Sequence, residues 1–410
     1  MQHINRESRW YWLVRLVHLA DLHLGWRPRF APDDVAGRLA AERVKVLSAA
    51  VDYALAPQNR VCGLLLGGDI FDDHRPPTEL VEQVLGLLGR ASAAGLLVAT
   101  VPGNHDELTY ADSVFRYYGP RWPGLLVTAP QPALVGTVDA AGTMVSIYGV
   151  AYVGGISTAT APLKGWPRPD GPGLHVALAH GTVVGAGGLP EAWAADERSL
   201  PLDAEDLGRA GYDYIALGHI HRSGAPTGWP AIWSPCRYGG LVAGRGFDDP
   251  GSGRFVVAEI AGRAEGGLKV VEPEVAVTGY HRLSLDVAGC ADQAALLAAA
   301  GSKVAGLGPG ELVRLLVAGV ASFPLDGPAL AAALATRGQL GYVEVVDDTI
   351  MVDADRLEAL AAERTVRGFF VRRLADKIDA ARREGDAAAE ALAHRALGYG
   401  IEALTKERRA

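Results

Sequence analysis

The sequence predicts a mixed α/β protein with two packed sheets, followed by a smaller α/β domain and a helical tail. Three observations lead to this prediction. Short apolar runs alternate with helical patterns in the first hundred or so residues, strand-like runs separated by Gly/Pro turns dominate from about 125 to 275, and a new strand–helix alternation starts near residue 275. Such alternation is typical of βαβ units around a buried sheet.

The first alternation predicts three strands and two helices. The apolar runs at 14–20, 61–69 and 96–103 are the expected strands, because each is short and rich in Val and Leu. Residues 33–55 and 78–95 are the expected helices, because their apolar residues recur at helical spacing.

The middle of the chain predicts a second sheet. Its strand-like runs are separated by turns with few long helical patterns, so the simplest interpretation is a sheet packed against the first. The expected strands are 143–150, 174–181, 212–219, 231–234 and 254–260.

The last third predicts a small βαβαβ domain and then a helical, Arg-rich tail. The expected strands are 280–287, 311–322 and 340–349, and the expected helices are 290–307 and 327–338. We place the domain boundaries at 1–275, 276–350 and 351–410. In the tail, one broad apolar face is expected to contain Val366, Phe369, Phe370, Leu374 and Ile378.

Composition restricts the class of protein. The 410 residues are 49% hydrophobic, which is typical of a globular protein. Cys62, Cys236 and Cys290 lie far apart, so neither a disulfide framework nor a zinc–thiolate site is expected. This cysteine usage and the absence of a long apolar run favour a cytoplasmic location without a membrane span. The net charge of −8 disfavours a simple nucleic-acid binder unless basic residues gather locally.

Five short motifs share one arrangement, in which a buried strand ends in residues that can bind a metal. Because strand ends on one edge of a sheet converge, residues far apart in sequence can build one site there. The motifs are ADLHLG (Asp21, His23), GGDIFDD (Asp69), PGNHD (Asn104, His105), LAHG (His180) and LGHIHR (His219, His221).

The residue types suit two divalent ions. Residues two apart in extended backbone point the same way, so each closely spaced pair is expected to aim at one ion. Imidazole and carboxylate ligands suit Mn, Fe or Zn. Seven ligands exceed what one ion needs, and Asp69 is the natural bridge between two. The two pairs are Asp21 with His23, and His219 with His221.

Taken in order, D-x-H, G-D-x-x-D, G-N-H-D, a lone H-G and G-H-x-H resemble the calcineurin-like metallophosphoesterases over about residues 13–275. The resemblance implies a four-layer αββα sandwich with two metals at the sheet edge. It implies that His105 faces the substrate and assists the leaving group, and we expect Asp106 to pair with its imidazole. The implied ligands are Asp21, His23, Asp69 and His221 for one ion, and Asp69, Asn104, His180 and His219 for the other.

The motifs LVHLADLHLG, GGDIFDD, PGNHDE and LGHIHR are most similar to the SbcD-type DNA repair nucleases, including the YhaO-like branch. The small α/β domain and the Arg-rich tail resemble that branch's capping domain and C-terminal helices. This resemblance implies a Mn²⁺-dependent DNA exonuclease with endonuclease activity. It also implies a homodimer beside an SbcC-like coiled-coil ATPase that docks on the tail. The other interpretation of the tail is a solvated helical hairpin that completes the fold.

Several charged residues near the motifs have open roles. Arg27, Arg29 and Arg75 follow the ligand motifs and are candidates for binding DNA phosphates, although exposed Arg is also common elsewhere. Some relatives have a histidine where Asp72 stands, and a carboxylate there would repel phosphate. Asp72 and His74 are therefore either supports of the ligands or residues of a solvated loop.

Two other functions fit the motifs. A phosphoesterase for small nucleotide-type substrates would share the metal site but surround it with a closed pocket. A non-catalytic scaffold would keep the fold and use the tail for binding. The second domain and the tail favour the nuclease, and the intact ligand set disfavours the scaffold.

Overall fold

The computed structural model describes residues 13–140, 142–154, 162–185, 198–226, 235–261, 267–287, 289–351 and 354–406. The chain divides into two compact units, Met1–Val277 and Thr278–Ala410. The expected small α/β domain and the tail both fall in the second unit. The expected strand at 231–234 lies outside the described residues.

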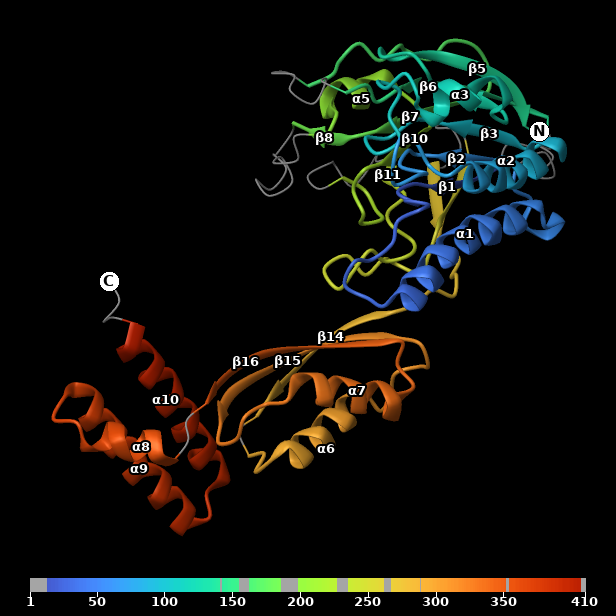
Figure 1. Ribbon diagram of the computed structural model, residues 1–410. Helices are drawn as coiled ribbons and strands as arrows, with labels where there is room; N and C mark the ends of the chain where they lie inside the picture. Colours follow the sequence, from blue (N-terminus) through green and yellow to red (C-terminus); the bar gives the residue numbers. More distant parts are fainter. Residues whose placement is uncertain are drawn as a thin grey trace, which may run out of the picture. The chain divides into compact units, whose positions relative to one another are not determined.

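The first unit contains two mainly parallel sheets (Figure 1). Six strands form the first sheet, in which β1 to β4 are parallel and β12 and β13 are antiparallel additions. Its order is β13 (Gly267–Val271), β12 (Val256–Ala261), β1 (Val14–Leu19), β2 (Gly63–Leu66), β3 (Leu97–Thr100) and β4 (Leu125–Leu126).

Five strands form the second sheet, which is parallel except for the β5–β6 pair. A separate two-stranded pairing joins β8 (Thr182–Val184) to β9 (Pro201–Asp203). The order of the five-stranded sheet is β11 (Cys236–Tyr238), β10 (Tyr214–Gly218), β7 (Leu174–His180), β6 (Thr143–Val150) and β5 (Ala133–Ala140).

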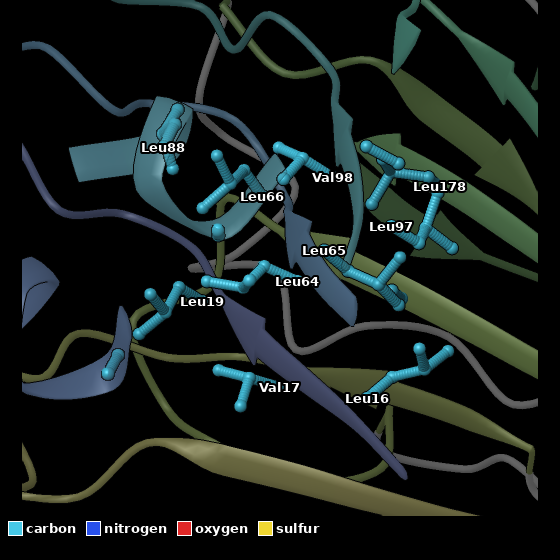
Figure 2. Close-up of a cluster of buried hydrophobic side chains, with 14 of the residues drawn as sticks. Leu16, Val17, Leu19, Leu64, Leu65, Leu66, Leu88, Leu97, Val98 and Leu178 are labelled. Carbon is cyan, nitrogen blue, oxygen red and sulfur yellow. The ribbon is translucent and has the colours of Figure 1, made fainter. Parts of the chain in front are cut away.

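One apolar core joins the first sheet to its neighbours on both sides. Leu88 of α2 (Thr78–Ala93) and Leu178 of β7 belong to the same buried cluster as Leu65 of β2 (Figure 2). Residues of α1 (Asp33–Leu55) pack in this cluster too. Strands covered on both faces read as continuous apolar runs, which is why β2 is conspicuous in the sequence.

A second core covers the outer face of the second sheet. Leu207 of α5 (Ala204–Ala210) packs there with Ile215 and Leu217 of β10. Helices, sheet, sheet and helix thus form the predicted αββα sandwich, and the fold prediction is confirmed. The strand expected at 254–260 was assigned to the wrong sheet, because β12 pairs with β1 in the first sheet. The short helix α3 (Val114–Tyr118) and the 3₁₀ turns η2 (Pro57–Asn59) and η3 (Gly119–Arg121) complete the unit.

The second unit begins with a parallel three-stranded sheet. The strands β14 (Tyr280–Asp286), β15 (Leu312–Ala321) and β16 (Tyr342–Met351) are joined by α6 (Gln293–Val304) and α7 (Gly327–Gly338). The aspartates Asp292 and Asp326 cap the two helices by accepting backbone N–H bonds. The helix α7 begins at the expected residue, whereas α6 begins at Gln293 and not at the expected residue 290.

Three helices close the chain: α8 (Ala354–Ala362), α9 (Val366–Glu384) and α10 (Ala387–Lys406). They pack around Val371 and Ile378 of α9, together with Phe370 and Leu374. The expected apolar face was therefore wrong in part, because Val366 and Phe369 are 76% and 59% exposed. Both side chains lie outside the apolar face of α9 that packs in this cluster. None of the described helices is long and apolar enough to cross a membrane.

Candidate metal centre

Metal-competent side chains meet where parallel strands of the two sheets end. In the first sheet they follow β1, β2 and β3, and in the second they end β7 and follow β10. Hydrogen bonds and short contacts link them into one largely buried cluster. The structure thus brings together all seven residues predicted as ligands: Asp21, His23, Asp69, Asn104, His180, His219 and His221.

The first part of the cluster contains Asp21, His23 and His221, whose ligand atoms all lie within 4.8 Å of one another. The Nε2 atoms of His23 and His221 are 3.3 Å apart. Asp21 Oδ1 accepts a bond from the backbone N–H of His219, whereas its buried Oδ2 has no hydrogen-bond partner among the described residues. A buried carboxylate oxygen that faces two imidazole nitrogens fits a bound cation.

The second part of the cluster surrounds Asn104. Its Oδ1 lies 2.9 Å from His180 Nε2 and 3.1 Å from His219 Nδ1. Asp69 Oδ2 lies 3.4 Å from His180 Nε2 and 3.8 Å from His23 Nε2, so this oxygen stands between the two parts. That position suits a carboxylate that bridges two ions.

Hydrogen bonds behind the cluster orient two of the imidazoles. His180 Nδ1 lies 2.8 Å from the carbonyl oxygen of Gly67, and His221 Nδ1 lies 2.5 Å from Asp249 Oδ2. Each contact places the Nδ1 proton outside the cluster and leaves Nε2 facing inward. Histidines that bind metals are commonly held in this way.

The pKa values reflect buried opposite charges. Burial would raise the pKa of Asp69, but His180 beside it holds that pKa well below its usual range. Burial would lower the pKa of His180, but the Asp69 carboxylate outweighs it and raises the pKa to about 9. Burial lowers the pKa of His23 to about 3, so its imidazole is neutral and able to bind a cation. Without a metal, a proton on His180 balances the charge of Asp69.

Backbone turns aim several of these side chains. Non-glycine residues rarely adopt positive φ, and each costs on the order of 1–3 kcal/mol. The expectation that residues two apart point the same way assumed an extended backbone, and the residues with positive φ do not have one. It also fails for the second pair, because His221 lies with His23 whereas His219 contacts Asn104. The positive φ values are 53° at Asp21, 44° at His23, 49° at Asp69 and 95° at His219.

His105 and Asp106 have separate surroundings. His105 is one-quarter exposed, and its Nδ1 lies 2.9 Å from the carbonyl oxygen of Asp72. Both carboxylate oxygens of Asp106 are buried and accept backbone N–H bonds from Gly103, Ile70 and Phe71. The expectation that Asp106 orients His105 was wrong, because Asp106 instead ties the loop after β3 to the loop after β2.

The arginines predicted to bind substrate lie outside the cluster. Arg27 donates to the carbonyl oxygen of Asp33, Arg29 is exposed, and Arg75 pairs with Asp112 at 3.2 Å. Their role in substrate binding stays a prediction. His74 stacks on Tyr110 with ring centroids 4.1 Å apart, on the same exposed loop as Arg75.

Sequence reasoning missed four residues that contact the cluster or its loops. Arg245 reaches His23 and Asp72, and Asp249 contacts His221. The fully buried Arg43 donates to the carbonyl oxygens of Leu22 and Gly244. Arg198 donates to the carbonyl oxygen of Asn104. No motif spacing identifies these residues, since each lies far in sequence from the ligand it supports.

Known proteins resemble this chain in sequence and in structure. Residues 14–223 match the calcineurin-like phosphoesterase family. The uncharacterized metallophosphoesterase YhaO of Bacillus subtilis (strain 168) is 25% identical over 214 residues, which cover 51% of this chain and 49% of that protein. The chain thus matches about half the length of that relative. A dimetal phosphatase from Danio rerio is 12% identical and covers 64% of this chain and 99% of its own, with a TM-score of 0.31.

The family match extends over half of the chain and ends just beyond the last histidine of the cluster, His221. Its span includes every residue predicted as a metal ligand. The chain therefore belongs to the calcineurin-like phosphoesterases, a family of enzymes that hydrolyse phosphoesters with divalent metals.

Proposed function

We propose that the protein is a two-metal DNA nuclease that hydrolyses phosphodiesters as an exonuclease with endonuclease activity. The observation that carries the proposal is the convergence of buried ligand atoms on both sides of Asp69 Oδ2. Bound divalent ions would activate a water molecule and polarise the phosphodiester. Imidazole and carboxylate donors suit Mn²⁺, which is the metal that we propose.

The contacts among the proposed ligands assign them to two ions. One ion would take Asp21, His23 and His221, and the other would take Asn104, His180 and His219, with Asp69 shared between them. His105 would face the scissile ester, since it lies at the edge of the cluster and is part-exposed. Held through Nδ1 by the Asp72 carbonyl, a protonated imidazole would donate from Nε2 to the departing sugar oxygen.

Two features favour DNA as the substrate. The order of the motifs resembles the SbcD-type nucleases, and the chain carries a second compact unit that a small substrate would not require. Arg27, Arg29 and Arg75 follow the ligand motifs in sequence and would contact phosphates away from the cleaved bond.

The tail supports a proposal about partners. Val366 and Phe369 expose apolar surface on one helix, and Leu392 and Tyr399 do so on the next. Exposed apolar side chains mark a binding surface when they form one contiguous patch, and we propose that these four do so. We propose that α9 and α10 dock an SbcC-like coiled-coil ATPase and that the nuclease acts as a homodimer.

The test is release of nucleotides from linear duplex DNA with Mn²⁺, measured beside hydrolysis of bis-p-nitrophenyl phosphate. We expect both activities, and we expect Asp69→Asn to abolish both because it weakens both metal positions. Activity on the chromogenic ester without activity on DNA would overturn the nuclease proposal. That outcome would favour the alternative of a small nucleotide-type substrate, which the net charge of −8 also suits.

A further inference from the structure

We propose that Arg245 is a phosphate-binding residue of the metal centre and that Asp72 is the positioning residue that holds it. This inference rests on the proposed phosphoester hydrolysis but not on DNA as the substrate. Arg245 Nη2 lies 3.2 Å from Asp72 Oδ1, and its Nη1 lies 3.4 Å from His23 Nε2. Arg198 also contacts a predicted ligand, but it does so at the backbone carbonyl of Asn104.

Arg245 places a positive charge next to the proposed metal sites, which is unfavourable unless an anion lies nearby. Its guanidinium points at the inward nitrogen of a ligand histidine, where the proposed ions would add further positive charge. A cation in that place is stabilised when an anion lies between it and the metals. The non-bridging oxygens of a phosphoester supply that anion, and the planar guanidinium matches them with parallel N–H donors.

The loop that carries Arg245 is firmly held. The backbone N–H of Arg245 donates to the carbonyl oxygen of Asp249, whose carboxylate contacts His221. The preceding residue, Gly244, accepts a bond from the buried Arg43 at 2.5 Å. The side chain of Arg245 is nevertheless 24% exposed, so an incoming phosphate can reach it. A rigid backbone below an accessible guanidinium is the arrangement that a binding residue needs.

Asp72 has a reason to be a carboxylate beside Arg245. A lone carboxylate near the cleaved ester would repel phosphate, but here its charge is balanced by the guanidinium. Asp72 Oδ1 also lies 3.2 Å from His23 Nδ1 and 3.8 Å from His105 Nδ1. This one oxygen therefore contacts Arg245 and lies close to both His23, a proposed metal ligand, and His105, the proposed general acid. Substrate would exchange part of the Asp72 contact for phosphate oxygens.

The first test measures binding of an anion rather than turnover. Inorganic phosphate is titrated into the Mn²⁺-loaded full chain by calorimetry, and metal content is measured for every variant. We expect Arg245→Gln to weaken phosphate binding at least tenfold with metal content unchanged, and Arg245→Lys to lose less. Arg254→Gln is the matched control, since this exposed arginine of the same unit pairs with Glu274. Unchanged phosphate affinity in Arg245→Gln, or loss of metal from it, would overturn the proposal.

The second test separates positioning from direct contact. Asp72→Asn should weaken phosphate binding in the native background but have little effect once Arg245→Gln is present, because Asp72 acts through Arg245. Additive effects in the double variant would contradict that role. If the chain binds phosphate through Arg245 yet hydrolyses neither DNA nor the chromogenic ester, the proposed function fails while this inference stands.

Discussion

At the scale of one residue, a proton on His180 balances the charge of Asp69 as a bound metal ion would. Its Nδ1 lies against the Gly67 carbonyl, and its Nε2 faces Asp69 Oδ2 at 3.4 Å. Because Asp69 raises the pKa of His180 to about 9, the metal-free chain keeps the imidazole protonated at neutral pH. A metal at this position must displace that proton.

We therefore expect metal binding to release protons and to weaken as pH falls. Between pH 6.5 and about 9 the imidazolium of His180 is the form that competes, so affinity should rise roughly tenfold per pH unit and level off above pH 9. Calorimetry of Mn²⁺ binding in two buffers of different ionisation enthalpy counts the protons released. A pH-independent affinity over this range would contradict the assignment of His180.

His105 should be required for hydrolysis but not for metal binding. Its side chain hydrogen-bonds Asp72, and only its backbone N–H reaches Asp69. We expect His105→Gln to lower kcat by about 10² to 10⁴ while the chain still binds close to two Mn²⁺ ions, because one proton transfer is lost. Metal analysis and steady-state kinetics measure both effects. His281→Gln, in the second unit, is the control, and equal loss of metal and activity in His105→Gln would refute the division of roles.

Gly103 should be intolerant of any side chain. A Cβ at this position would overlap the carboxylate and the backbone N of Asp69. We expect Gly103→Ala to reduce metal content by displacing Asp69, as measured by metal analysis after reloading. Gly86→Ala is the matched control: no atom of the described residues lies within 4 Å of a Cβ at this position in α2, so the variant should keep the metals and stabilise the helix by about 0.5–1 kcal/mol. Full metal content in Gly103→Ala would show that the loop adapts.

At the scale of elements, the site depends on how loops after different strands are joined. Arg43 of α1 donates to the carbonyl of Leu22, between the first two ligands, and to that of Gly244. Its guanidinium also lies 4.6 Å from the ring centre of Trp26. One buried cation thus connects the loop after β1 to the loop that carries Arg245 and Asp249.

Replacing Arg43 should destabilise the first unit and loosen the metal centre. Arg43→Met removes the guanidinium that donates to two buried carbonyl oxygens, at roughly 1–3 kcal/mol for each lost bond. We expect the midpoint of urea unfolding to fall and Mn²⁺ affinity to decrease, with partial recovery in Arg43→Lys. Unfolding followed by fluorescence, together with Mn²⁺ titration, measures both. An unchanged midpoint would rule out a bracing role.

Some strands can be predicted from the sequence more readily than others. The strands β1, β2 and β3 are buried on both faces, so their sequences are nearly continuous apolar runs. By contrast, β5 has only one fully buried residue, and β11 has only three residues. Such strands are stabilised by pairing with their neighbours, which leaves little pattern in the sequence.

At the scale of the whole molecule, we expect the two compact units to serve different functions. The metal centre lies entirely within Met1–Val277. We expect residues 1–277 to hydrolyse bis-p-nitrophenyl phosphate at a rate within about threefold of the full chain, because every proposed ligand is present. We also expect this fragment to lose most of its activity on duplex DNA. Retained DNA activity would show that the second unit serves another purpose.

The sequence by itself determined the family, the sandwich fold and the seven candidate ligands. Metal-competent residues at strand ends are readable because parallel strands must bring those ends to one edge of a sheet. The alternation of strand-like runs and helical patterns also predicted the βαβαβ part of the second unit.

Only the tertiary structure decided which ligands lie together and what supports them. The side chains of Asp21, His23, Asp69 and His219 are aimed by left-handed turns that hold only under the packing around them. Asp106 braces two loops, and Arg245 reaches the cluster from 222 residues beyond His23. Local spacing cannot encode such contacts, because they exist only once the two sheets have packed.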